Sequence, residues 1–114
     1  MKTIIAGSRY FTDVKLVYRA VADSDFHITE VVSGCASGID YLGEQYAIAM
    51  GVPIKKFPAD WDTYGKSAGY IRNIAMGEYA DALVAVWDGK SKGTKHMIDI
   101  ATKLGLKIYV YAVN

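Results

Sequence analysis

The chain of 114 residues has few of the side chains that build disulfides or metal centres. It contains one cysteine, Cys35, and two histidines, His27 and His96. A single cysteine excludes an internal disulfide and any metal site built from several cysteines, a usage typical of a reducing compartment. The histidines lie too far apart in sequence to indicate a zinc site. We therefore expect neither a metal nor a cofactor.

Long apolar runs and an excess of one charge are also missing. No apolar run reaches the roughly 18 residues of a membrane-spanning helix, and the N-terminus lacks the layout of a signal peptide. The net charge is +1, so the field of the whole molecule is weak and does not favour binding to a polyanion. We expect a soluble cytoplasmic protein that has no membrane partner, and the near-neutral charge argues against nucleic acid as its main ligand.

What is present is an alternation of apolar runs and amphipathic segments along a chain with 52% hydrophobic residues, which fits one compact domain over residues 1–114. Several of the runs are continuous and β-branched, as in strands that are covered on both faces. The five predicted strands are Thr3 to Ala6, Glu30 to Ser33, Ile54 to Phe57, Ala82 to Trp87 and Lys107 to Ala112.

Four segments between these runs carry apolar residues at helical spacing. The first extends from Asp13, a residue type that caps helices, to Ser24, and the second and fourth stop at Gly51 and Gly105. The predicted buried stripes are Val14, Val17, Tyr18 and Val21; Ile39, Leu42, Tyr46 and Met50; Ala68, Ile71, Ala75 and Tyr79; and Met97, Ile98, Ala101 and Leu104.

This alternation predicts a doubly wound, Rossmann-like α/β domain whose five-stranded parallel sheet has the order 3-2-1-4-5. Right-handed crossovers place helices on both faces, and ligands bind at the carboxyl ends of the strands. The one long connection, from Pro58 to Ser67, contains Trp61 and Tyr64. A connection of this length is often a ligand lid, although aromatic residues beside it can instead close over the core.

Three glycine-containing turns follow predicted strands and precede predicted helices. They are Gly7-Ser8-Arg9, Ser33 to Asp40, and Trp87 to His96. Free backbone N–H groups and the helix dipole at such turns attract phosphate, so the three turns together predict one composite nucleotide site. The first turn lacks the second and third glycines of the dinucleotide fingerprint, and neither Gly-Lys-Ser tripeptide has the earlier glycine of a P-loop.

Several of these residues allow two interpretations. Gly7-Ser8-Arg9 can hold an anion through an N–H group, a hydroxyl and a guanidinium, or can be an ordinary turn with a surface arginine. Asp40 can accept a hydrogen bond from a ribose hydroxyl or simply complement the helix dipole. Cys35, near a helix start, can have a lowered pKa, but no partner base is evident and we favour a packing role.

The motifs together resemble those of the YspA-like branch of the SLOG superfamily, in order and across nearly the whole chain. The resemblance rests on Gly7 to Arg9, Ser33 to Asp40, Phe57 to Trp61, Gly69 to Asn73, Trp87 to Gly89 and Gly93 to His96. The superfamily includes DNA-processing protein A and the Lonely Guy phosphoribohydrolases. The resemblance implies a Rossmann-like domain that binds a nucleotide or a nucleotide-derived molecule.

One departure from the Lonely Guy pattern bears on catalysis. Gly93 and Thr94 match the Gly-Thr pair of its motif and Arg72 resembles its helix arginine, but Met97 stands where the motif has glutamate. Losing that carboxylate removes the group expected to stabilise charge on the sugar or to handle a proton. His96 can donate to phosphate or be solvated.

We therefore expect binding or sensing of a nucleotide-type ligand, with a homodimer or larger homo-oligomer implied by the resemblance. The alternatives are hydrolysis of an N-glycosidic or phosphoribosyl bond through a relocated carboxylate, and binding of single-stranded nucleic acid. No catalytic residue is assigned. The expected ligand-binding residues are Gly7, Ser8, Arg9, Gly34, Gly38, Asp40, Arg72, Asn73, Asp88, Gly89, Ser91, Gly93 and Thr94.

Overall fold

The computed structural model describes residues 1–113 and confirms the predicted α/β architecture. Five parallel strands form one sheet in the order β3-β2-β1-β4-β5. The strands are β1 (Lys2–Gly7), β2 (Glu30–Ser33), β3 (Ile54–Lys56), β4 (Ala82–Trp87) and β5 (Lys107–Ala112). The apolar runs thus located each strand to within one residue at either end. These runs are continuous and β-branched, so their apolar residues do not show the spacing of an amphipathic helix.

The helices lie where the apolar spacing predicts them, with small differences at the ends. They are α1 (Lys15–Ser24), α2 (Ile39–Met50), α3 (Trp61–Tyr64), α4 (Ala68–Tyr79) and α5 (Lys92–Lys103), and a 3₁₀ turn, η1 (Gly65–Ser67), precedes α4. The first helix begins after Asp13, whose Oδ1 accepts a hydrogen bond from the Lys15 N–H at 3.0 Å. Ser91 caps α5 by accepting a hydrogen bond from the Thr94 N–H.

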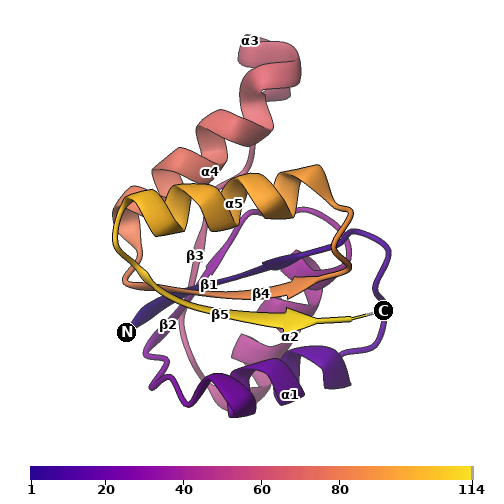
Figure 1. The fold of residues 1–114 in the computed structure, drawn as a ribbon, viewed down its shortest axis with the longest axis vertical. Helices are drawn as coiled ribbons and strands as arrows, with labels where there is room; N and C mark the ends of the chain where they lie inside the picture. The colour runs from indigo at the N-terminus through magenta and orange to yellow at the C-terminus, as the bar shows by residue number, and fades with distance from the viewer. Residues whose placement is uncertain (114) are drawn as a thin grey trace.

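Helices cover both faces of the sheet (Figure 1), with α1 and α2 on one side and α4 and α5 on the other. Alternate residues of the central strands point to opposite faces. Ile5 and Val84 therefore pack with α1 and α2, whereas Ile4 and Leu83 pack with α4 and α5. These four side chains are at most 1% exposed, so β1 and β4 are the buried centre of the sheet.

All four predicted helix stripes are partly wrong, because each includes one exposed residue: Tyr18, Met50, Ile71 and Leu104. Met50 is 56% exposed and Ile71 is 42% exposed, whereas the buried residues of α4 include Asn73, Met76 and Gly77. A Cβ at Gly77 would lie 2.9 Å from Ile100 Cγ2, so the missing side chain at Gly77 is what lets α4 pack closely against α5. That packing turns Asn73 inward, and hydropathy alone cannot predict it.

The segment from Pro58 to Ser67 is helical in part. Asp60 starts α3 by accepting a hydrogen bond from the Thr63 N–H at 3.1 Å, and η1 joins α3 to α4. Figure 1 shows α3 at the end of α4, projecting away from the sheet. Trp61 and Tyr64 are each about half exposed, so these aromatic rings do not close over the core.

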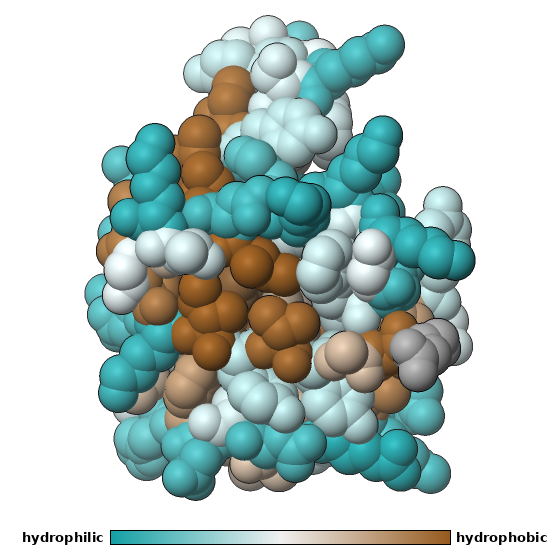
Figure 2. Space-filling view, viewed as in Figure 1, coloured by the Kyte–Doolittle hydropathy of each residue, from teal (hydrophilic) through white to brown (hydrophobic). Residues whose placement is uncertain are grey.

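Apolar side chains reach the surface on the outer side of α4 and between α5 and β5 (Figure 2). On α4 these include Ile71 and Ile74, each more than 40% exposed. None of the helices within residues 1–113 combines the length and apolarity that crossing a bilayer requires. Exposed apolar side chains also occur on α2, at Ile48 and Met50.

Gly7 ends β1 opposite Val86 of β4, where a side chain would have no room. A Cβ at Gly7 would lie 2.2 Å from the carbonyl oxygen of Val86 and 2.8 Å from Ile39 Cγ1. We expect Gly7→Ala to lower the free energy of unfolding by about 3 kcal/mol, because strand and helix must both shift. Urea denaturation measures the change.

The matched control is Gly93→Ala, since no atom lies within 4 Å of a Cβ at that position in α5. Alanine is the better helix former by about 1 kcal/mol, so this variant should be at least as stable as the wild type. Equal losses of stability in the two variants would contradict the close approach at Gly7.

Candidate functional site

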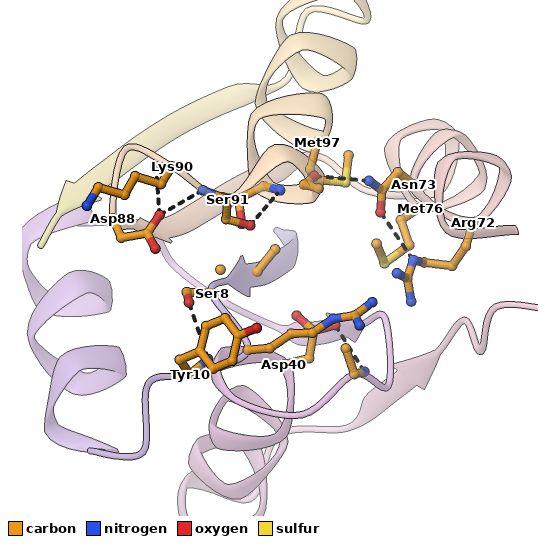
Figure 3. A pocket seen from close by; sticks show the side chains of 16 residues that line it. Ser8, Tyr10, Asp40, Arg72, Asn73, Met76, Asp88, Lys90, Ser91 and Met97 are labelled. Carbon is orange, nitrogen blue, oxygen red and sulfur yellow. Dashed lines mark hydrogen bonds between the residues drawn. The ribbon is translucent and has the colours of Figure 1, made fainter. Parts of the chain in front are cut away.

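A cavity of about 430 Å³ opens at the carboxyl ends of β1 and β4. The strand order reverses between these two strands, which is where doubly wound folds bind their ligands. Figure 3 shows Asp88 and Lys90 at one end of this main cavity and Arg72 at the other, with Ser8 between them. The residues lining it are Ala6, Gly7, Ser8, Arg9, Tyr10, Ala36, Asp40, Arg72, Asn73, Met76, Asp88, Lys90, Ser91, Gly93, Thr94 and Met97.

Most of the predicted site residues come together here. Those on the main cavity are Gly7, Ser8, Arg9, Asp40, Arg72, Asn73, Asp88, Ser91, Gly93 and Thr94. Gly34 lies on a neighbouring cavity, and Gly38 and Gly89 line neither. The sequence interpretation did not assign Tyr10, which adjoins a predicted turn, or Lys90, which lies within one.

The loops that follow β1 and β2 are held together by backbone contact at Gly38. The Ile39 N–H donates to the carbonyl oxygen of Ser8 at 3.1 Å, and a Cβ at Gly38 would lie 2.4 Å from that same oxygen. Gly38 also has φ +72°, a conformation that favours glycine. Its role in this structure is therefore to let two loops touch, and the contact presents Ser8 and Arg9 to the main cavity.

Arg72 reaches from α4 across to the loop after β2. Its Nη1 donates to the carbonyl oxygen of Gly34, and its Nε donates to Asn73 Oδ1 at 3.1 Å. A Cβ at Gly34 would lie 2.8 Å from Arg72 Nη1 and 2.7 Å from Asp40 Oδ2. The space that a side chain at Gly34 would fill is thus bordered by both a guanidinium and a carboxylate.

Asp40 is a buried carboxyl group, 7% exposed, on the wall of the main cavity. Burial raises the pKa of Asp40 to about 6, and the Ala36 N–H, which donates to Oδ2 at 3.2 Å, together with the Arg72 charge offsets only part of that effect. Burial also lowers the pKa of the Arg72 guanidinium. The cavity therefore holds an acid that titrates far above the usual range of a carboxyl group.

The loop between β4 and α5 already uses several of its N–H groups. Asp88 Oδ1 accepts hydrogen bonds from the Lys90 and Ser91 N–H groups, both at 2.8 Å, and these bonds lower the pKa of Asp88. Within residues 1–113, the N–H groups of Lys92 and Gly93 at the start of α5 have no hydrogen-bond partner. The donors left for an anion here are thus fewer than the sequence suggests.

Asn73 connects Arg72 to α5. Its Nδ2 donates to the carbonyl oxygen of Gly93 at 3.3 Å and lies 3.1 Å from His96 Nδ1. Since Nδ2 can only donate, Nδ1 of His96 is the acceptor and carries no proton. Burial lowers the pKa of His96. Its ring packs edge-on against the ring of Tyr70, with the two ring centroids 4.5 Å apart. His96 therefore positions α4 against α5 and does not line the main cavity.

A side cavity of about 290 Å³ adjoins the main cavity. It is lined by Arg9, Gly34, Cys35, Ala36, Ser37, Pro58, Ala59, Trp61 and Arg72. Cys35 is exposed, so the favoured packing role is wrong. Partial burial of the thiol and the Glu44 charge raise the pKa of Cys35, which does not favour the reactive thiolate.

Within residues 1–113, no three side chains of His, Cys, Asp or Glu lie close enough together to hold a metal ion. The charged side chains on the main cavity are those of Arg9, Arg72 and Lys90 together with Asp40 and Asp88, which can donate and accept hydrogen bonds.

These features define a Rossmann-like domain with its cavity at the reversal of strand order. The profile of the YspA, cpYpsA-related SLOG family matches residues 1–64. The chain is also 35% identical to the gene 61 protein of Mycobacterium phage D29 over 117 aligned residues, which cover 94% of this chain and 93% of that protein. The chain belongs to the YspA, cpYpsA-related SLOG family. No solved structure gives a significant match.

The raised pKa of Asp40 generates a prediction about stability. A carboxyl group with a pKa of about 6 in the folded protein and about 3.9 in the unfolded chain binds more protons when folded. The free energy of unfolding therefore falls as pH rises from about 4 to about 6. Asparagine cannot ionise and keeps an oxygen for the Ala36 N–H.

We expect the stability of Asp40→Asn relative to wild type to rise by about 2 kcal/mol between pH 4 and pH 7. Urea denaturation at several pH values measures this difference. A difference that stays constant with pH would contradict the raised pKa of Asp40.

Proposed function

We propose that the protein binds a nucleotide or a nucleotide-derived small molecule in the main cavity. The observation that carries the proposal is the convergence of Arg9 and Arg72, two of the three arginines of the chain, with the buried Asp40 at the reversal of strand order. Guanidinium groups bind phosphate through paired hydrogen bonds, and a carboxylate accepts hydrogen bonds from sugar hydroxyls. Family membership supports the same class of ligand.

In this proposal, different parts of the main cavity bind different groups of the ligand. Gly7, Ser8 and Arg9 face one anionic group, with Arg72 supplying charge from the other side. Asp40 faces the ribose. The Lys92 and Gly93 N–H groups at the start of α5, supported by the helix dipole, face a further phosphate beside Ser91 and Thr94.

Asp40 also supports a second candidate, an N-glycosidic hydrolase, because a buried carboxyl group with a pKa of about 6 is suited to acid–base work. We favour binding without turnover. Met97, at the position of the Lonely Guy glutamate, lines the cavity while 1% exposed among apolar side chains of the core. A thioether there neither transfers a proton nor stabilises positive charge.

The cytoplasmic location and the homo-oligomer remain proposals. The support for self-association is the uncovered face of α4, where Ile71 and Ile74 are exposed next to the site. Static light scattering of the purified protein gives the mass in solution, and a monomer at working concentration would contradict this part of the proposal.

The main proposal is tested by removing one arginine that has no structural partner. Arg9 makes no hydrogen bond or ion pair within residues 1–113, so Arg9→Ala should leave the melting temperature without ligand unchanged. It should weaken binding of nucleotide about tenfold or more, since a hydrogen-bonded charge pair is lost. Thermal shifts with AMP, GMP, CMP and UMP provide the measurement.

Arg19→Ala is the matched control, because Arg19 is an exposed arginine on α1 away from both cavities. It should change neither the melting temperature nor the shift that nucleotides produce. Failure of all four nucleotides to stabilise the wild type, or equal losses in the two variants, would contradict the proposed site.

The hydrolase candidate is separated by an assay for free base. With the same four monophosphates, we expect no base release above the buffer blank, because the cavity has methionine where the hydrolytic relatives have glutamate. Chromatography after prolonged incubation provides the measurement. Base release that disappears in Asp40→Asn would favour hydrolysis through Asp40 instead.

A further inference from the structure

The main cavity and the side cavity have a common wall. Arg9, Ala36 and Arg72 line both, so the two volumes are compartments on either side of a pair of guanidinium groups. A mononucleotide in the main cavity would leave the side cavity without an occupant. Only a ligand longer than a mononucleotide would extend past the shared residues into the side cavity.

The side cavity has a different chemistry from the main cavity. Its lining has two guanidinium groups and no carboxylate, whereas Asp40 and Asp88 line the main cavity. Phosphate is therefore favoured at the dividing wall, and sugar hydroxyls are favoured beside the carboxylates. Beyond the arginines, the walls of the side cavity are small residues, Pro58 and Trp61.

Trp61 is the one aromatic residue that lines the side cavity in the part of the chain that the structure describes. A Cβ at Gly69 would lie 3.4 Å from Trp61 Cη2 and 3.8 Å from Arg72 Nη2, so the indole edge packs against the start of α4, close to Arg72. The side chain nevertheless remains 50% exposed. An aromatic ring that is fixed at one edge and open to a cavity is a surface on which a base can stack.

The two arginines have hydrogen-bond donors to spare. A guanidinium has five N–H groups, and Arg72 uses Nη1 and Nε to hold its place through Gly34 and Asn73. Its Nη2 group and the whole of Arg9 have no partner within residues 1–113. One guanidinium is thus fixed and the other is free to close on a phosphate.

We propose that the two compartments together bind a dinucleotide, with one nucleoside in the main cavity, the bridging phosphate between Arg9 and Arg72, and the second base against Trp61. This inference rests on the proposed function and specifies its ligand class. A 5′,5′-diphosphate bridge and a 3′,5′-phosphodiester bridge carry the same anionic group to the arginines, so both linkages belong to the class.

Titration calorimetry with defined dinucleotides tests the proposal. The probes are AMP, diadenosine 5′,5′-diphosphate and 5′-phosphorylated adenylyl-(3′,5′)-adenosine, with the guanine counterparts as a second set. We expect at least one dinucleotide to bind about tenfold or more tightly than its monophosphate, the effect of stacking one base. The linkage that binds identifies the bridge.

Trp61→Ala should remove that advantage and leave the affinity for the monophosphate unchanged, whereas Trp61→Phe should keep most of it. Tyr64→Ala is the matched control, because Tyr64 is an equally exposed aromatic residue of α3 that lines neither cavity. It should bind every probe as the wild type does.

The outcomes separate this inference from the function on which it rests. If the monophosphates bind and the dinucleotides bind no more tightly, the dinucleotide proposal fails and the proposed function stands. The same holds if Trp61→Ala weakens monophosphate and dinucleotide equally. If neither monophosphates nor dinucleotides bind, both proposals fail.

Discussion

The close parallel pairing of β1 with β4 is the constraint on which the site depends. At the end of this pair Gly7 lies opposite Val86, so near that no side chain fits between them. The strand order reverses here, and the loops that leave the two strands turn to opposite faces of the sheet. A crevice between diverging loops follows from this topology, and the identity of the loop residues then decides what the crevice binds.

Missing side chains allow polar groups to meet in that crevice. The absence of a side chain at Gly38 lets the loop after β2 touch the loop after β1, and its absence at Gly34 lets Arg72 and Asp40 approach one Cα. Partial burial of a guanidinium costs free energy unless it is hydrogen-bonded, and the Gly34 carbonyl and Asn73 supply these bonds. Glycine thus acts here mainly through packing between protein segments.

The strands and the sheet order were predictable because continuous β-branched runs and their spacing depend on local sequence. The buried face of α4 was not, because it depends on Gly77 allowing α5 to approach. The predicted site residues were chosen from short motifs, most of them at the ends of strands, and most of these residues line one cavity. The bonds that occupy Asp88 and Arg72 were not predictable, since they join atoms whose positions only the folded chain defines.

The side cavity could not be predicted from the motifs, because residues of separate loops form its walls. Its walls come from the loop after β2, which carries Cys35, and from the segment after β3, which carries Trp61. The sheet order β3-β2-β1-β4 places these loops next to those of the main cavity, all at the carboxyl ends of the strands. The length of the combined cavity therefore depends on how many neighbouring strands have loops with an open space between them at their carboxyl ends. In this fold that space extends sideways from the reversal point, past the two arginines, towards α3.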